Sequence, residues 1–137
     1  QGYLKFLNKK KIKFKKNYYI SVKNEDPDDS AQEIKKLILK NSKITAIICS
    51  TEYSAAGAIK ALNQLNKKIG KNISLITFDG SVVNSISSPS ITAVTHDRKQ
   101  LGKKAIEILT SNQKTKINYF LAKPKIIERG SVHQVRE

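Results

Sequence analysis

Polar side chains follow short apolar runs at several places in this chain, and they are the residues most able to do chemistry. They are Asn24-Glu25-Asp26, Ser50-Thr51-Glu52, Asp79-Gly80 and Thr95-His96-Asp97. Asp79 follows the most apolar run, residues 73–78, and its carboxylate is costly to bury without a partner. A carboxylate at this position can accept hydrogen bonds from ligand hydroxyl groups or attract a cation. The pattern therefore predicts a recognition site for a hydroxylated, neutral or cationic ligand.

Catalysis is the alternative use of the same acids. His96 could act as a base beside Asp97 or Asp79, or it could be an ordinary hydrogen-bonding loop residue. Glu25 or Asp26 could act as a general acid or base, although Asp26 also suits a helix cap. The sequence contains no HExxH motif, no Cys/His cluster, no Gly-rich phosphate loop and no GxSxG elbow. We therefore expect no enzyme activity, no metal and no cofactor.

The net charge of +15 raises the possibility of a nucleic-acid contact. The 26 basic residues comprise 23 Lys and 3 Arg, however, and the densest run, residues 9–16, has no Arg and a single aromatic residue, Phe14. Such a run is poor in the side chains that read or stack on bases. We interpret it as a solvated face.

Length and composition predict one domain, or part of one. The chain has no methionine and opens with Gln1-Gly2, which leads us to expect a fragment of a longer protein. No apolar run approaches the roughly 20 residues of a membrane span, so no membrane contact is expected. The single cysteine, Cys49, excludes a disulfide within the chain and is expected to be a small buried hydrophobe.

The elements that must position these acids alternate between strand and helix. Periodicity predicts helices over residues 2–8, 26–41, 53–68 and 97–109, and strands over residues 18–22, 44–49, 73–78, 91–95, 117–121 and 125–128. Asp26 before Pro27 is a strong helix start. Gly57 inside a helix costs about 1 kcal/mol, which predicts close packing against a strand or another helix. In the last helix the side chains expected to face inward are Leu101, Ala105, Ile108 and Leu109.

This alternation predicts the α/β class: three αβα layers around a mostly parallel sheet, with residues 73–78 as a strand buried on both faces. Right-handed crossovers place the carboxyl ends of parallel strands at one edge. We therefore expect the polar loops to converge there around Asp79.

Three ordered segments resemble a known family: residues 45–62, residues 73–80, and residues 88–97 followed by Leu101-Gly102. They are similar to the C-terminal half of the regulatory domain of LacI/GalR-family transcription repressors. The family pattern is a strand ending in Asn-Asp, a helix with Ala-x-Gly-Ala, a Phe-Asp-Asp turn, and Pro-Pro-x-Thr-Thr-Val before a helix with Leu-Gly. Gly2-Tyr-Leu and residues 126–130 fit the family's first helix and closing strand.

The resemblance implies a periplasmic-binding-protein-like fold, with residues 1–137 as the C-terminal lobe of an effector-binding and dimerisation domain. The DNA-binding domain and most of the N-terminal lobe would lie outside the chain. The whole protein would be a cytoplasmic, homodimeric bacterial repressor that meets operator DNA through that separate domain. Its effector, a sugar or a purine, would bind between two lobes. By position, Asp79 would hydrogen-bond effector hydroxyl groups, Thr51 and Glu52 would face the cleft, and Glu25 lies on the same predicted edge.

The resemblance also implies a dimer surface and leaves alternatives open. The residues that match it are Tyr53, Ala56, Val82, Val83 and Ile86. The chain departs from the family in having Thr51 in place of Asn and Gly80 in place of the second Asp. A solute-binding protein of a sugar ABC transporter would share the fold, although residues 88–94, Ser-Pro-Ser-Ile-Thr-Ala-Val, favour the repressor. An α/β enzyme is the third class.

Overall fold

The computed structural model describes residues 2–22, 24–80, 82–111 and 119–134. In chain order the elements are α1 (Gly2–Lys9), the 3-10 helix η1 (Lys16–Tyr18), α2 (Pro27–Lys40), β1 (Ala46–Cys49), α3 (Glu52–Gln64), β2 (Ser74–Phe78), α4 (Val82–Ile86), β3 (Thr92–Thr95), α5 (Arg98–Thr110) and β4 (Lys125–Ile127). Among the described residues, no helix is both long and apolar enough to cross a bilayer.

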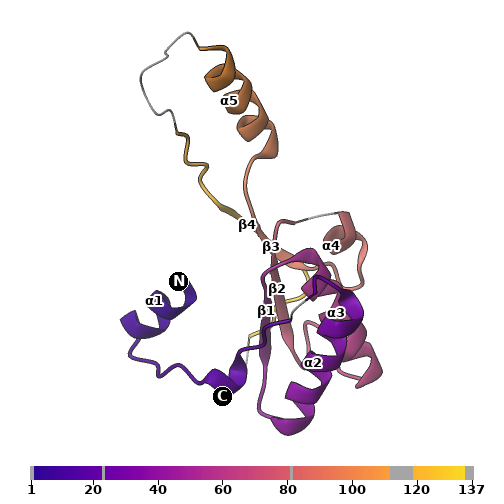
Figure 1. The fold of residues 1–137 in the computed structure, drawn as a ribbon. Helices are drawn as coiled ribbons and strands as arrows, with labels where there is room; N and C mark the ends of the chain where they lie inside the picture. Colours follow the sequence, from indigo (N-terminus) through magenta and orange to yellow (C-terminus); the bar gives the residue numbers. More distant parts are fainter. Residues whose placement is uncertain (1, 23, 81, 112–118, 135–137) are drawn as a thin grey trace.

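The described strands form one mixed sheet in the order β1-β2-β3-β4. The pairs β1–β2 and β2–β3 are parallel, and β4 runs antiparallel to β3. Ile47 pairs with Leu75, and Thr77 pairs with Ala93. The carboxyl ends of β1, β2 and β3 therefore lie at the same edge of the sheet (Figure 1). The predicted α/β class with a mostly parallel sheet is confirmed.

Helix α2 begins where the sequence predicts. The Asp26 carboxylate accepts hydrogen bonds from the backbone N–H groups of Asp28 and Asp29, at 2.7 and 3.0 Å, and Pro27 is the first helical residue. The cap satisfies two N–H groups that have no partner inside the helix, and the acids of the first turn favour the positive end of its dipole.

Gly57 marks the crossing of α2 and α3. A Cβ atom at Gly57 would lie 2.5 Å from the Cβ of Ser30 and 2.6 Å from the carbonyl oxygen of Pro27. Ordinary carbon contacts are about 3.5–4.0 Å, so only glycine allows the two backbones to come this close. Close packing against another helix, predicted as the reason for this glycine, is confirmed.

The core lies between the α2–α3 pair and one face of the sheet. Its buried side chains are Ala31, Ile34, Ile38, Cys49, Ala55, Ala58, Ala61, Leu62, Ile69, Ile73, Leu75 and Ile91. Burial of each large aliphatic side chain contributes about 1.5–3 kcal/mol, so this face carries most of the stability of the described chain. Because α3 packs directly on β1 and β2, the core also fixes the loop that joins β1 to α3.

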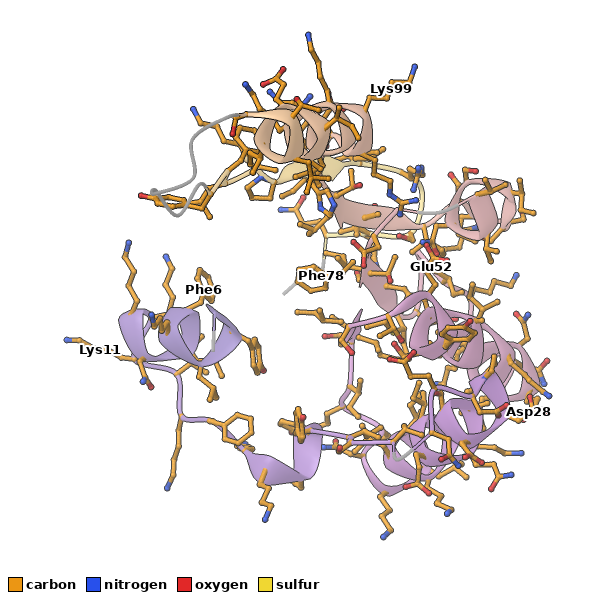
Figure 2. The ribbon with its side chains drawn as sticks, turned by 45° about the horizontal axis from the view of Figure 1, so that its top comes forward. Phe6, Lys11, Asp28, Glu52, Phe78 and Lys99 are labelled. Atoms are coloured by element: carbon orange, nitrogen blue, oxygen red, sulfur yellow. The ribbon has the colours of Figure 1, made fainter. Side chains whose placement is uncertain are left out.

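The opposite face of the sheet is less covered. Figures 1 and 2 place α1 on the side of the strands away from α2 and α3, where the three-layer expectation puts a helix. Ile48 and Phe78 nevertheless remain 58% and 44% exposed, and Phe6 of α1 is 56% exposed. Within the described residues the third layer is therefore not packed, and the expected burial of the central strand on both faces fails at Phe78.

Three expectations about individual elements are wrong. Residues 18–22 form no strand, because η1 occupies the start of this segment and no described strand lies beside the rest. Helix α5 has no buried residue, and Leu109 is 79% exposed instead of facing inward. Of the predicted strand over residues 117–121, residues 117–118 lie outside the described residues, and residues 119–121 are not a strand. In each case the sequence has the local propensity but the structure lacks the packing partner.

The C-terminal segment returns to the amino ends of β2 and β3. Ser131 is fully buried, and its hydroxyl donates to the carbonyl oxygen of Leu75 at 2.6 Å and accepts from the N–H of Thr92 at 2.8 Å. Two residues on, the His133 Nδ1 lies 3.0 Å from the Ser74 hydroxyl. These bonds hold the two central strands together at the edge opposite Asp79.

Candidate functional site

The carboxyl edge of the sheet gathers the loops in which the sequence places its acids. Thr51 and Glu52 follow β1, Asp79 follows β2, and Arg98 begins the helix after β3. The parallel pairing of the strands brings these loops to one edge. The Thr77 hydroxyl in β2 lies 3.4 Å from the carbonyl oxygen of Thr51, which places the loop after β1 against the carboxyl end of β2. Three of the four predicted effector residues therefore share one edge.

Asp79 adopts an unusual backbone conformation at the end of β2. Its φ angle is +62°, in the left-handed region that few residues other than glycine enter, although Asp tolerates it better than most. Its N–H donates to the carbonyl oxygen of Val94 at 2.9 Å, so the backbone is anchored to β3. No donor among the described residues bonds the carboxylate, and the residue is exposed. The carboxylate is thus available to a ligand.

Arg98 is a part of this edge that sequence reasoning missed. Its Nη2 donates to the carbonyl oxygen of Asp79 at 3.1 Å and lies 4.0 Å from Oε1 of Glu52. The Arg98 and Glu52 side chains are 62% and 38% exposed, so the ion pair contributes at most about 1 kcal/mol. The sequence gives little indication of this role, because Arg98 is one of 26 basic residues and directly follows the cap residue Asp97. Arg98 thus brings one positive charge to the edge that carries Glu52 and Asp79.

The Thr51 side chain caps the start of α3. Its hydroxyl accepts from the Ser54 N–H at 3.2 Å, and Ser54 Oγ donates to the Thr51 carbonyl at 2.8 Å and accepts from the Thr51 N–H at 3.1 Å. The Thr51 and Ser54 hydroxyl oxygens are 3.1 Å apart. This reciprocal capping box occupies much of the hydrogen-bonding capacity of the Thr51 hydroxyl.

Cys49 lies just before this capping box, at the end of β1. It is 3% exposed, as the sequence predicts for a small buried hydrophobe. Burial raises the pKa of its thiol from 9.0 to about 12, against the opposing effect of a hydrogen bond with Ser54. The thiol therefore stays neutral at ordinary pH and is a poor nucleophile.

Glu25 is the predicted site residue that the structure does not join to the others. It is exposed and precedes the α2 cap residue Asp26. In the part of the chain that the structure describes, no hydrogen bond or ion pair links it to Thr51, Glu52 or Asp79. The capping role of Asp26, by contrast, is confirmed.

His96 and Asp97 do not form an acid–base pair within the described residues. The Asp97 carboxylate caps α5 by accepting from the N–H of Gln100 at 3.0 Å. This bond is the main reason why the pKa of Asp97 is lowered, and the positive charge of Lys125 acts in the same direction. The His96 carbonyl accepts from the Thr95 hydroxyl at 3.4 Å, and no described carboxylate bonds the imidazole ring. The described residues also contain no group of three or more His, Cys, Asp or Glu placed to hold a metal ion.

The residues predicted for a dimer surface are mostly exposed. Tyr53, Val82 and Ile86 are 52%, 73% and 74% exposed, Val83 is 48% exposed, and Ala56 is half-buried. They come from α3 and α4, which follow the neighbouring strands β1 and β2. Large exposed apolar side chains on helices that follow neighbouring strands are compatible with the predicted interaction surface.

A mostly parallel sheet with polar loops at its carboxyl edge is the architecture of α/β ligand-binding domains. The family profile of the periplasmic binding protein-like domain matches residues 1–132. The chain therefore belongs to this family.

Similar proteins give the relationship more detail. The chain is 28% identical over 109 residues to the HTH-type transcriptional repressor PurR of Aliivibrio salmonicida, covering 77% of this chain and 33% of that protein. It is 30% identical over 134 residues to the protein of the same name from Vibrio atlanticus, covering 96% of this chain and 40% of that protein. The crystal structure of a PurR family transcriptional regulator from Vibrio parahaemolyticus matches with a TM-score of 0.70 and 27% identity, covering 80% of this chain and 41% of that chain.

These matches confirm the resemblance to the effector domain of LacI/GalR-type regulators. They favour a regulator over a transporter's solute-binding protein, because the curated relatives are named as transcriptional repressors. The chain spans only 33–40% of the length of these curated relatives.

Proposed function

We propose that this chain is the effector-binding and dimerisation part of a bacterial transcription repressor that responds to a small molecule, a sugar or a purine. Residues 1–137 form the C-terminal lobe of the effector-binding domain, and operator DNA is bound by a domain outside the chain. The protein has no catalytic function. The relatives named as transcriptional repressors support this proposal, and so does the architecture of the carboxyl edge.

The observation that carries the proposal is the exposed Asp79 carboxylate at the end of the central strand, with Glu52 beside it on the same edge. Paired carboxylates can accept hydrogen bonds from vicinal sugar hydroxyl groups or from the N–H groups of a purine. Arg98 contacts the Asp79 carbonyl and the Glu52 carboxylate, and one positive charge beside two carboxylates suits a neutral ligand better than an anionic one. Thr51 and Glu52 contribute from the start of α3, directly after β1.

The dimer surface comprises Tyr53 and Ala56 of α3 together with Val82, Val83 and Ile86 of α4. Burial of their apolar surface would favour association by about 25 cal/mol per Å², against the cost of the freedom that the two chains lose on binding. The homodimer would place two copies of the ligand site in one assembly, so that ligand binding at each site can alter the spacing of the attached DNA-binding domains.

The proposal is tested by a thermal-shift screen of the full-length protein against neutral sugars and purine bases. A hit is then measured by titration calorimetry in the Asp79→Asn variant, which keeps the size of the side chain and its tolerance of a positive φ but removes the charge. Loss of a hydrogen bond to a charged group costs about 1.5–3 kcal/mol, so we expect binding to weaken by roughly 10- to 150-fold. Glu128→Gln is the matched control, because it removes an exposed carboxylate that belongs to no predicted site.

Unchanged affinity in Asp79→Asn would show that the effector binds elsewhere. Turnover of the bound sugar or purine would show that the protein is an enzyme. The gene sequence upstream of Gln1 tests the class of protein. A helix-turn-helix segment there supports a repressor, and a signal or lipoprotein peptide would make the protein a transporter's solute-binding protein.

A further inference from the structure

Helix α5 stands apart from the other helices. Figure 1 shows α5 beyond the ends of the strands, away from α2 and α3, and none of its residues is buried. Within the described residues, all the hydrogen bonds and ion pairs that connect α5 to the sheet and to α3 involve Arg98, its first residue. The other polar contacts of this helix are local, such as the pair of Lys104 with Glu107. Arg98 is thus the side chain through which α5 reaches the loop of Asp79 and the start of α3.

The same side chain contacts the strained residue of the candidate site. A non-glycine residue at positive φ costs about 1–2 kcal/mol and persists only where its surroundings hold it. Asp79 is held on one side by the bond from its N–H to Val94 and on the other by the bond from Arg98 to its carbonyl. An arginine suits this position, because its planar guanidinium group can donate to the Asp79 carbonyl while remaining close to the carboxylate of Glu52.

We propose that Arg98 is a positioning residue of the ligand site: it holds the loop that presents the Asp79 carboxylate and ties the orientation of α5 to that loop. This inference rests on the proposed function only in taking Asp79 as a ligand group. The consequence is a direct mechanical route from the site to α5. A ligand that moves Asp79 or takes over the Glu52 carboxylate changes the contacts that hold α5, and by linkage any change in α5 alters the affinity for that ligand.

The first test needs no ligand. Hydrogen exchange of the Asp79 amide, followed by mass spectrometry or NMR in the full-length protein, reports the opening of the loop, because that N–H is bonded to Val94 when the loop is closed. We expect exchange to become roughly two- to tenfold faster in Arg98→Gln and to be partly restored in Arg98→Lys, which keeps the charge and a donor. Lys99→Gln is the matched control, since its side chain extends away from Glu52 in Figure 2; it should exchange as the wild type does.

The second test measures α5 directly. Spin labels at Asn63→Cys in α3 and Lys103→Cys in α5 report the distance between these helices, and both positions are exposed while the native Cys49 is buried. We expect a single narrow distance distribution when Arg98 is present and a broad one in Arg98→Gln. Glu52→Gln should broaden the distribution less, because the Arg98–Glu52 ion pair, at 4.0 Å, is longer than the bond from Arg98 to the Asp79 carbonyl. Arg98→Gln indistinguishable from wild type in both exchange and distance would overturn the proposal.

Binding separates this inference from the proposed function. With D-ribose, cellobiose and hypoxanthine as probes, Arg98→Gln should weaken any binding that Asp79→Asn also weakens. If none of these probes or the wider screen yields a ligand, the proposed function fails while the exchange and distance results still decide the role of Arg98. If a probe binds and Asp79→Asn weakens it but Arg98→Gln does not, the proposed function stands and the positioning role of Arg98 is wrong.

Discussion

Replacing Gly57 by alanine tests whether the packing of α2 against α3 depends on backbone contact. The new methyl group would lie 2.5 Å from Ser30 Cβ and 2.6 Å from the Pro27 carbonyl oxygen, about 1 Å inside normal contact. Neither atom is the end of a flexible side chain, so α2 must shift. Overpacking of this kind costs about 1–3 kcal/mol, whereas alanine is favoured over glycine in a helix by about 1 kcal/mol. Because the clash is with fixed atoms, we expect a net loss of about 1–2 kcal/mol.

Gly102 provides the matched control, because it also lies inside a helix but a Cβ atom added there would have nothing within 4 Å. Gly102→Ala should therefore stabilise the protein by up to about 1 kcal/mol through helix propensity alone. Both variants are measured by urea unfolding followed by circular dichroism, since the chain has no tryptophan. Gly57→Ala unfolding at or above the wild-type midpoint would refute the close approach of the two helices.

Three further substitutions test other contacts. Asp26→Ala removes the cap that accepts from Asp28 and should cost about 1 kcal/mol of unfolding free energy in urea. Ser131→Ala leaves the buried N–H of Thr92 without its partner and should cost about 1–3 kcal/mol in the same assay. Because burial raises the pKa of Cys49 from 9.0 to about 12, the folded state keeps a proton that the unfolded state loses, so stability should fall as the pH rises between these values, by at most about 1.4 kcal/mol per pH unit. Cys49→Ala should lack this component when unfolding midpoints at about pH 8 and about pH 10 are compared.

The sequence predicts most of what depends on local patterns. The start of α2 follows from the preferences of Asp for the N-cap and of Pro for the first helical position, and the structure places Asp26 and Pro27 at these positions. The strands of the central sheet follow from short apolar runs, and their parallel pairing follows from the helices between them. The reason for Gly57 could also be predicted, because an unfavourable helix residue needs a packing explanation.

Features that depend on distant partners could not be predicted in this way. Residues 18–22 have the composition of a strand, yet a strand forms only where another strand offers its backbone. The apolar stripe of α5, which includes Leu109, is real but has no covering surface among the described residues. Ser131 and Arg98 act through contacts with residues distant in sequence, and neither residue type is informative at its position without the fold.

The candidate site lies at the less tightly bonded end of the sheet. At the amino ends of β2 and β3, Ser131 is fully buried and bonds both strands, and Gly70 lies so close to the Gly130 carbonyl that a Cβ atom would collide with it. At the carboxyl edge the loop of Asp79 is exposed and is held by single bonds to Val94 and Arg98. Local opening costs least where few buried contacts are lost. In the proposed function, a ligand at Asp79 would shift its loop and α5 without disturbing the strand order that the C-terminal segment secures at the other end of the sheet (Figure 1).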